Sequence, residues 1–334
     1  MQKPNIFAIA TKELSQDAFI TWLIQWADQQ YSENEDGLYK IGQSFVSFLL
    51  SKKIDVTNLE IQKVEAGRQW DNIDIWAEVN ERFFIIIEDK TETSEHDNQL
   101  DRYSKQVSDL YGSSREIVPI YLKTGLEDIY IGKGIQEKGW SYCDRNDLLS
   151  FLSSHETTND IYNDFVSHLK QKDAESKSFV QYRQLNSWEA SKGLFVWLQQ
   201  QIQEWTQWGY VSNPSGGFLG FWFHFVPCEA NEKREFYLQI ENSCCNKCNL
   251  FIKISGEWSH DSRYLYSKLH YLNEIEHKYN LSISKPSRFR PGEYTSLAVI
   301  KNSFKNDNGK LDLENLLNKI KNACSLVDEL AKNS

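Results

Sequence analysis

Five consecutive apolar residues, Phe83 to Ile87, form one of the longest apolar runs of the sequence and are followed at once by Glu88-Asp89-Lys90. The run is far shorter than the roughly 20 apolar residues that a membrane-spanning helix needs. It has the length of a β-strand that is covered by other elements on both faces. Side chains alternate across a strand, so Glu88 and Lys90 project to one face and Asp89 to the other. The run therefore predicts a covered sheet whose rigid strand directs two charged groups into one site.

A hairpin partner for this strand is expected at residues 72–79, because the dipeptide Asn80-Glu81 suits the tight turn between the two runs. The isoleucines and the alanine of 72–79 share one face of that strand, which leaves Asp74 on the other. If the two strands pair as a hairpin, Asp74 and Glu88 converge at one edge of the sheet.

The remaining elements of the first half alternate between helices and strands. A first helix is expected over 15–30, with Ser15 as its cap, and Asp144 is expected to cap a later one. Further helices are predicted at 39–53, 95–110 and 159–172, and further strands at 59–67, 117–122, 128–132 and 140–143. The order of helix, strands, helix and strand is typical of an α/β sandwich and differs from a repeated βαβ array.

The second half has the pattern of an α+β domain with its own antiparallel sheet. The polar segment 171–177 separates the halves, and we predict domains at 1–172 and 173–334. Helices are expected at 188–208, 264–279 and 313–331, and strands at 218–226, 235–242, 249–258 and 294–301.

Asp74, Glu88 and Lys90 together suggest a metal site. Two carboxylates brought within several ångströms repel each other, and one has its pKa raised unless a cation lies between them. Mg²⁺ prefers carboxylates, water and substrate phosphates as ligands. A lysine beside them can hold an attacking water or offset the charge that develops on a phosphate. The alternative is an ion-pair cluster on the surface at a hairpin end, since charged residues often end strands.

The order Glu13, Asp74, Glu88-x-Lys90 and Gln99-x-x-x-Tyr103 resembles the PD-(D/E)xK nuclease superfamily, in particular a bacterial branch with Glu-Leu-Ser before a Trp-Leu-rich first helix. The resemblance covers roughly residues 10–150. It implies a restriction-endonuclease-like αβββαβ core with a mixed sheet. It also implies Mg²⁺- or Mn²⁺-dependent hydrolysis of phosphodiester bonds by a metal-activated water, with DNA favoured over RNA.

Carried over position by position, Asp74 and Glu88 match the metal-binding carboxylates of that family. Lys90 matches the lysine that assists the attacking water, and Glu13 matches the acidic residue of the first helix. No proline precedes Asp74, which is a mild departure from the family pattern. Asp71 competes for the role of Asp74, but it lies before the alternating strand. Glu13 is equally well explained as a surface carboxylate near a helix N-terminus, where the helix dipole favours it.

Two further sets of residues are candidates for binding the substrate. Gln99 and Tyr103 are four residues apart and share one face of a predicted helix, where they face the metal site or, alternatively, belong to an ordinary amphipathic helix. Lys285, Arg288 and Arg290 lie in a basic stretch, 278–290, that also contains aromatic residues and could follow a phosphate backbone and stack a base. The alternative for this stretch is a solvated loop.

The cysteines are too few and too irregular for a disulfide framework, which indicates a reduced, cytoplasmic protein. Cys245 and Cys248 have zinc-ligand spacing, but no second pair completes a site. The nearest histidine downstream is His260, and a turn with reduced cysteines is the simpler explanation. No signal peptide and no transmembrane helix is expected from the sequence.

A net charge of −10 argues against a surface that attracts nucleic acid everywhere. Part of this acidity is explained by the metal site, whose local charge changes sign when a divalent cation binds. The favoured function is a metal-dependent deoxyribonuclease, whose expected partners are nucleic acid and a second copy of the chain. The alternatives are a non-catalytic binding module on the same fold and an effector of bacterial defence that is silent until triggered.

Overall fold

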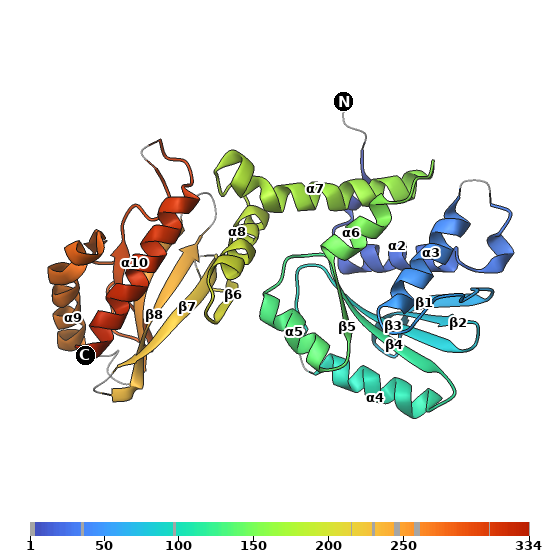
Figure 1. The fold of residues 1–334 in the computed structure, drawn as a ribbon, viewed down its shortest axis with the longest axis horizontal. Helices are drawn as coiled ribbons and strands as arrows, with labels where there is room; N and C mark the ends of the chain where they lie inside the picture. The colour runs from blue at the N-terminus through green and yellow to red at the C-terminus, as the bar shows by residue number, and fades with distance from the viewer. Residues whose placement is uncertain are drawn as a thin grey trace. The chain divides into compact units, whose positions relative to one another are not determined.

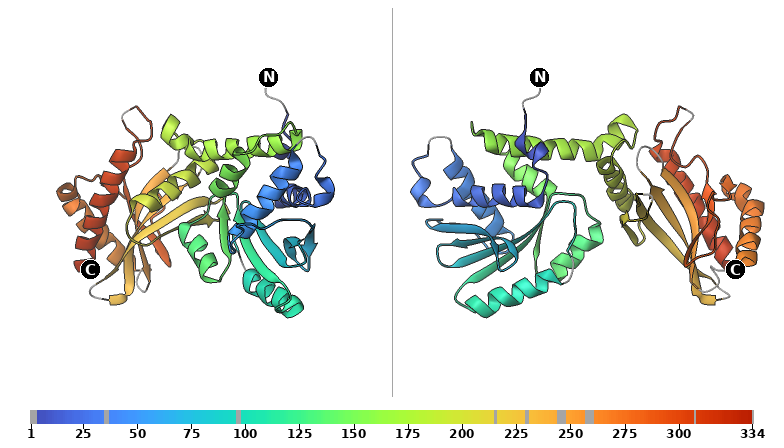
Figure 2. Two further views of the ribbon diagram at one scale, coloured as in Figure 1. Left: turned by 45° about the vertical axis from the view of Figure 1, so that its right-hand side comes forward. Right: turned by 180° about the vertical axis from the view of Figure 1, so that it is seen from behind.

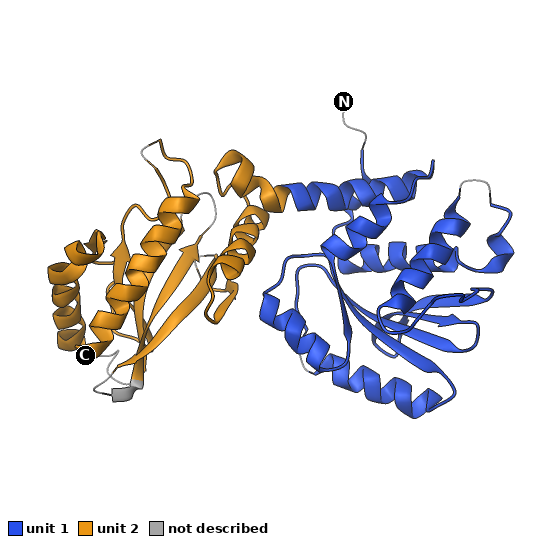
Figure 3. Ribbon diagram, viewed as in Figure 1, with its two compact units in different colours: residues 1–174 blue, residues 175–334 orange. Residues whose placement is uncertain are grey.

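The computed structural model describes residues 4–34, 37–95, 98–214, 216–228, 231–243, 248–256, 261–306 and 308–333. It divides into two compact units, Met1–Ala174 and Glu175–Ser334 (Figure 3). The division falls inside α7 (Asp160–Tyr182), a single helix that contains the polar segment 171–177. The expected end of this helix at Lys172 is therefore wrong, because Lys, Ala and Glu are good helix formers even without apolar neighbours. The assignment of residues 1–172 and 173–334 to two functional domains stays a prediction.

The first unit contains a five-stranded sheet in the order β1-β2-β3-β4-β5. Its strands are β1 (Val64–Trp70), β2 (Ile73–Val79), β3 (Phe83–Lys90), β4 (Glu116–Lys123) and β5 (Ser141–Asp144). The first three pair antiparallel, whereas β3, β4 and β5 pair parallel. The mixed sheet that was expected for the first half is thus confirmed.

Helices cover both faces of this sheet (Figure 1), and the two further views in Figure 2 show the same layers. The helices of this unit are α1 (Ile6–Ile9), α2 (Glu13–Gln25), η1 (Gln29–Tyr31), α3 (Leu38–Ser51), α4 (Gln99–Tyr111), α5 (Ile129–Glu137), α6 (Arg145–Ser153) and most of α7. Alternate residues of β3 join different cores: Phe83, Ile85 and Ile87 pack with α2 and α3, while Phe84 and Ile86 pack with α4. The prediction of a strand buried on both faces is confirmed.

Two tight turns fix the register of the antiparallel strands. Asn80 and Glu81 have φ of 52° and 53°, and Asp71 and Asn72 have φ of 51° and 71°. Positive φ at both central positions is typical of the type I′ turn, whose twist matches that of a hairpin. The predicted hairpin through Asn80-Glu81 is confirmed.

Four local expectations for the first unit are wrong. The helix α2 begins at Glu13, so Ser15 lies inside it and does not cap it. Residues 128–132 belong to α5, because the Asp128 side chain accepts the N–H of Tyr130 and starts a helix. The strand expected from residue 59 begins only at Val64. Ile73 packs with the α4 core, whereas Ile75 packs on the α2 side, since the turn at Asp71 and Asn72 ends the regular alternation.

The second unit contains a six-stranded antiparallel sheet in the order β10-β11-β9-β8-β7-β6, which confirms the α+β expectation. Its strands are β6 (Thr206–Val211), β7 (Phe218–Cys228), β8 (Asn231–Asn242), β9 (Cys248–Gly256), β10 (Ile283–Ser284) and β11 (Tyr294–Ile300). Its helices are α8 (Trp188–Gln201), α9 (Ser262–Ile275), η2 (Glu276–Tyr279) and α10 (Leu313–Lys332). The helix expected over 188–208 ends at Gln201, and its last residues form β6, where Trp208 pairs with Phe221. Across the described residues, no helix is long and apolar enough to cross a membrane.

Candidate active site

The pairing of β2 with β3 brings Asp74, Glu88 and Lys90 together. The register pairs Ile75 with Ile87, which places Asp74 across from Glu88. The Oδ2 atom of Asp74 accepts a hydrogen bond from the backbone N–H of Asp89 at 3.0 Å. The Lys90 Nζ atom lies 3.8 Å from the same oxygen and donates a hydrogen bond to Glu88 Oε1. Three charged groups from two strands thus form one cluster.

Glu88 is the most buried member of this cluster. Its side chain is only 1% exposed, and its Oε2 atom has no hydrogen-bond partner among the described residues. Burial and the nearby charge of Asp74 raise the pKa of Glu88 to about 7, against the opposing effect of Lys90. A buried carboxylate oxygen without a partner is costly unless a cation or a proton compensates it.

Lys90 keeps its proton despite its burial. Burial by itself lowers its pKa, but the hydrogen bond to Glu88 and the charges of Glu88 and Asp74 outweigh this effect and raise the pKa above its usual value. The Lys90 ammonium is therefore a donor and a positive charge at this site, and it does not act as a base.

The donor set of this cluster fits a hard divalent cation. Asp74 and Glu88 offer carboxylate oxygens, which Mg²⁺ and Mn²⁺ prefer, and one of these oxygens is unpartnered among the described residues. The Asp74 side chain is 24% exposed, so the cluster is open to solvent on one side.

Glu13 lies at the start of α2 and contacts the chain just beyond Lys90. Its Oε1 atom accepts hydrogen bonds from the N–H of Thr91 at 3.0 Å and from the hydroxyl of Thr93 at 2.9 Å. Its negative charge also contributes to the raised pKa of Lys90. The structure therefore brings Glu13 near the cluster and also gives it a structural task, so both interpretations of this residue have support.

Gln99 and Tyr103, at the start of α4, lie on the same side of the sheet as Glu88. The Gln99 amide donates to the Tyr103 hydroxyl at 3.4 Å, and the buried Gln99 Oε1 atom has no partner within the part of the chain that the structure describes. Burial, together with the charges of Glu88 and Asp74, raises the pKa of Tyr103. The tyrosine ring packs in the core, while its hydroxyl lies close enough to Glu88 and Asp74 for their charges to affect its pKa.

Asp71, the competitor of Asp74, has a different location. It sits in the turn between β1 and β2 and accepts a hydrogen bond from the Gln106 side chain. Asp71 therefore lies outside the strand pairing that joins Asp74 to Glu88. The geometry favours Asp74 as the carboxylate that acts with Glu88.

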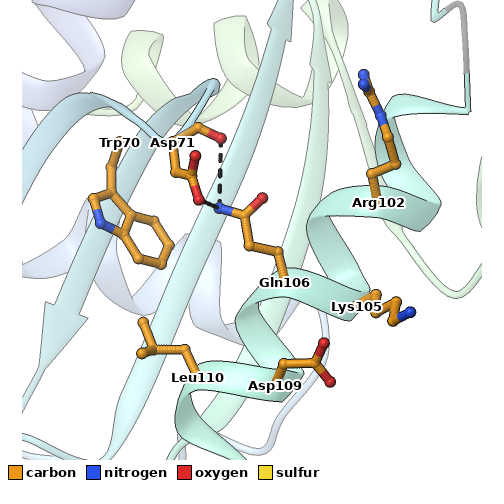
Figure 4. Close-up of a pocket in the computed structure, with 7 residues that line it drawn as sticks. All are labelled: Trp70, Asp71, Arg102, Lys105, Gln106, Asp109 and Leu110. Carbon is orange, nitrogen blue, oxygen red and sulfur yellow. Dashed lines mark hydrogen bonds between the residues drawn. The ribbon is translucent and has the colours of Figure 1, made fainter.

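A groove beside this turn carries two exposed cations. It has a volume of about 760 Å³ and lies between the end of β1 and helix α4 (Figure 4). Its lining residues are Trp70, Asp71, Arg102, Lys105, Gln106, Asp109 and Leu110. The indole of Trp70 is held by an edge contact with Phe84, with ring centroids 5.6 Å apart. The sequence patterns did not predict this groove or the position of Trp70 beside it.

Sequence reasoning missed a buried acid pair behind the cluster. Asp89 points away from Glu88, as alternation predicts, and meets Asp17 and the amide of Gln16 from α2. Burial raises the pKa of Asp17 to about 6 and that of Asp89 well above its usual range. One buried oxygen of each carboxyl has no hydrogen-bond partner among the described residues, and the mutual proximity of the two groups favours a proton on one of them. The only hint in the sequence was the position of Asp89 on a strand with two buried faces.

The basic residues of the 278–290 stretch belong to the second unit. Lys285 lies over the rings of Tyr266 and Phe289 and donates to the Tyr266 hydroxyl at 2.8 Å, whereas Arg288 and Arg290 extend toward solvent. A role for these three cations in substrate binding stays a prediction. Cys245 and His260 lie outside the described residues, and Cys248 begins β9.

The comparison with known families agrees with this arrangement. A family model described as PD-(D/E)XK nuclease superfamily matches residues 4–191. No curated protein and no solved structure matches the chain significantly. The match spans more than half of the sequence and includes the strands that carry Asp74, Glu88 and Lys90. The chain belongs to the PD-(D/E)XK nuclease superfamily.

Proposed function

We propose that this protein is a divalent-metal-dependent nuclease that hydrolyses phosphodiester bonds, with DNA as the substrate. Asp74 and Glu88 would hold Mg²⁺ or Mn²⁺, with Glu13 as a third acidic group. The observation that carries this proposal is the buried Oε2 atom of Glu88, which lacks a partner among the described residues and lies beside Asp74 and Lys90. Family membership supports a nuclease that uses a divalent metal.

When bound, such an ion supplies positive charge that polarises a phosphate and lowers the pKa of a water molecule. Residues of the chain itself position the reacting groups and offset the developing charge. The Lys90 ammonium donates to the attacking water or to a phosphate oxygen and offsets the charge that develops in the transition state. The Asp74–Asp89 hydrogen bond keeps Asp74 at the strand end, so its carboxylate needs little reorganisation.

Helix α4 gives the substrate a second set of contacts. Gln99 and the hydroxyl of Tyr103 would donate to a phosphate next to the scissile one. From the same helix, Arg102 and Lys105 offer charge to the backbone of the same strand, while Trp70 offers a ring face for stacking. Lys285, Arg288 and Arg290 would add contacts from the second unit, which by this proposal selects the substrate.

The test is cleavage of duplex DNA, single-stranded DNA and RNA of the same sequence by the full chain with Mg²⁺ or Mn²⁺. Glu88→Gln and Lys90→Ala should each reduce cleavage by on the order of 100-fold or more. Lys63→Ala is the matched control, because Lys63 is an exposed lysine that pairs with Glu81 at the hairpin turn.

Undiminished cleavage in both site variants would contradict the assignment. Cleavage of RNA alone would retain the nuclease and refute DNA as the substrate. Failure of the wild-type chain to bind Mn²⁺ in calorimetry would favour the non-catalytic binding module.

A further inference from the structure

A second group of metal-ligating side chains lies in the other unit, at Glu204, His224 and Cys324. One candidate ligand atom from each residue lies within 4.8 Å of the other two, and no other such trio occurs among the residues that the structure describes. The three come from separate parts of the chain: the segment between α8 and β6, strand β7 and helix α10. Nothing in the nuclease site requires this cluster.

The backbone directs His224 into the cluster. The register of β7 with β8 shifts by one residue between Phe223 and Val226, which is a β-bulge. His224 sits in this bulge with φ of 55°, a left-handed conformation that is uncommon for residues other than glycine. Helix α10 packs on β7 and β8 (Figure 1). The His224 imidazole reaches Asp328 of that helix.

Both ring nitrogens of His224 meet potential partners. Nδ1 lies 3.1 and 3.2 Å from the two carboxylate oxygens of Glu204. Nε2 lies 3.1 Å from Asp328 Oδ1 and 3.1 Å from the backbone oxygen of Cys324. Cys324 and Asp328 are four residues apart in α10, so their side chains share one face of that helix.

The spacing of Glu204 and Nδ1 suits two ligands of one zinc ion. Zn–N and Zn–O bonds of about 2.0–2.1 Å at a tetrahedral angle separate the two ligand atoms by roughly 3.3 Å. The observed distances are 3.1 and 3.2 Å. The Glu204 side chain is 41% exposed and that of His224 is 15% exposed, so an ion can enter from solvent and the glutamate can adjust.

We propose that Glu204, His224 and Cys324 form a zinc site. A thiolate, an imidazole and a carboxylate together suit Zn²⁺ better than Mg²⁺ or Ca²⁺. Asp328 accepts the remaining N–H of His224 and orients the ring, a common arrangement of zinc-bound histidines. Three protein ligands leave the fourth position to water. The ion fastens the segment after α8 and the bulge of β7 to α10, and so stabilises the second unit.

The competing interpretation is a protonated imidazole held between two carboxylates. Burial opposes this charge, but hydrogen bonds to Cys324 and Glu204 outweigh burial and raise the pKa of His224 to about 11. In that arrangement the Cys324 side chain is a hydrogen-bond partner of the imidazole and binds no metal. The two interpretations therefore differ in whether Cys324 binds the metal.

The experiment uses the full chain, stripped with a chelator and titrated with Co²⁺ as a coloured substitute for Zn²⁺. A Glu88→Gln background removes the ion bound at the nuclease site. We expect one equivalent of Co²⁺ per chain, a thiolate-to-cobalt charge-transfer band, and loss of the band when Zn²⁺ is added. Cys324→Ser should remove the band, and His224→Gln should weaken Co²⁺ binding by at least about tenfold.

Cys248→Ser is the matched control and should keep both the band and the affinity. Zinc should also raise the melting temperature of the Glu88→Gln chain but not that of the chain that also carries Cys324→Ser. The proposal is overturned if stoichiometric Co²⁺ gives no thiolate band, if the band survives Cys324→Ser, or if it is lost in Cys248→Ser. Asp328→Asn provides a milder variant that retains the fold and should reduce the affinity without removing the band.

Discussion

The Asp74 carboxylate is bound to the backbone of the neighbouring strand: its Oδ2 atom accepts the N–H of Asp89 at 3.0 Å. Asp89 lies between Glu88 and Lys90 in the sequence, so this bond ties the acid of β2 to the two charged residues of β3. The cluster therefore depends on strand register. A shift of one residue in the β2–β3 pairing would turn Asp74 to the opposite face.

Metal binding should depend on pH through Glu88. Its pKa of about 7 means that a proton competes with the cation for this carboxylate. The affinity for Mn²⁺ should rise as pH increases through 7 and fall by up to about tenfold per unit below it. Calorimetric titrations between about pH 6 and about pH 8 check this. Equal affinities across that range would show that Glu88 is not a ligand, and Glu88→Gln should bind weakly at every pH.

The buried acid pair should limit stability at neutral pH. The folded-state pKa of Asp17, about 6, is raised above its ordinary value of 3.8, so folding favours the protonated form. This stabilisation is present at low pH and is lost as pH rises toward 6. Asp17→Asn should therefore stabilise the protein by about 1–3 kcal/mol above pH 6 and have little effect near pH 4.

Thermal unfolding of Asp17→Asn and wild-type protein across this range measures the difference. Asp17→Ala is the control: it removes the acceptor next to Asp89 and should not reproduce the gain. A stability difference that does not change with pH would contradict the shared proton.

The groove on α4 should contribute to nucleic-acid affinity. Arg102→Gln with Lys105→Gln should weaken DNA binding and reduce the slope of log affinity against log salt by about 1 for each phosphate that these side chains neutralise. Asp109→Asn, in the same groove, should leave the slope unchanged or improve binding. Fluorescence anisotropy at several salt concentrations provides the measurement. An unchanged slope in the double variant would exclude the groove from the path of the substrate.

The Tyr103 hydroxyl should matter for turnover and not for folding. Its ring is buried in the core, so Tyr103→Phe keeps the packing and removes only the donor. Cleavage should slow by roughly tenfold to 150-fold, about the effect of removing one hydrogen bond to a charged group. Tyr111→Phe is the control, because Tyr111 packs on Phe84 at the other end of the same helix. Equal rates for Tyr103→Phe and wild type would leave Tyr103 with a packing role only.

Two substitutions distinguish the two possible roles of Glu13, which are metal binding and hydrogen bonding to the segment after β3. Glu13→Gln keeps an oxygen for Thr91 and Thr93 but removes the charge. If Glu13 belongs to the metal site, this variant should bind Mn²⁺ several-fold more weakly with an unchanged melting temperature. Glu13→Ala should also lower the melting temperature, corresponding to about 1 kcal/mol. Unchanged Mn²⁺ affinity in Glu13→Gln would restrict Glu13 to holding the segment after β3.

Local patterns predicted the centre of the site well. An apolar run of five residues requires cover on both faces, and strand alternation then places Glu88 and Lys90 together and Asp89 apart. The same reasoning failed at 128–132, where β-branched residues suggested a strand. There the Asp128 side chain caps a helix, and this local hydrogen bond outweighs the intrinsic preference.

The sequence by itself determined the covered sheet, the hairpin and the order of the acidic residues, because these follow from periodicities that span only a few residues. Only the tertiary structure decided that Asp17 meets Asp89, that Trp70 faces α4, and that Glu204, His224 and Cys324 gather in one place. Such contacts join residues up to 120 positions apart (324 − 204). They depend on strand register, on a single bulge and on the packing of helices, none of which is encoded in a short stretch of chain.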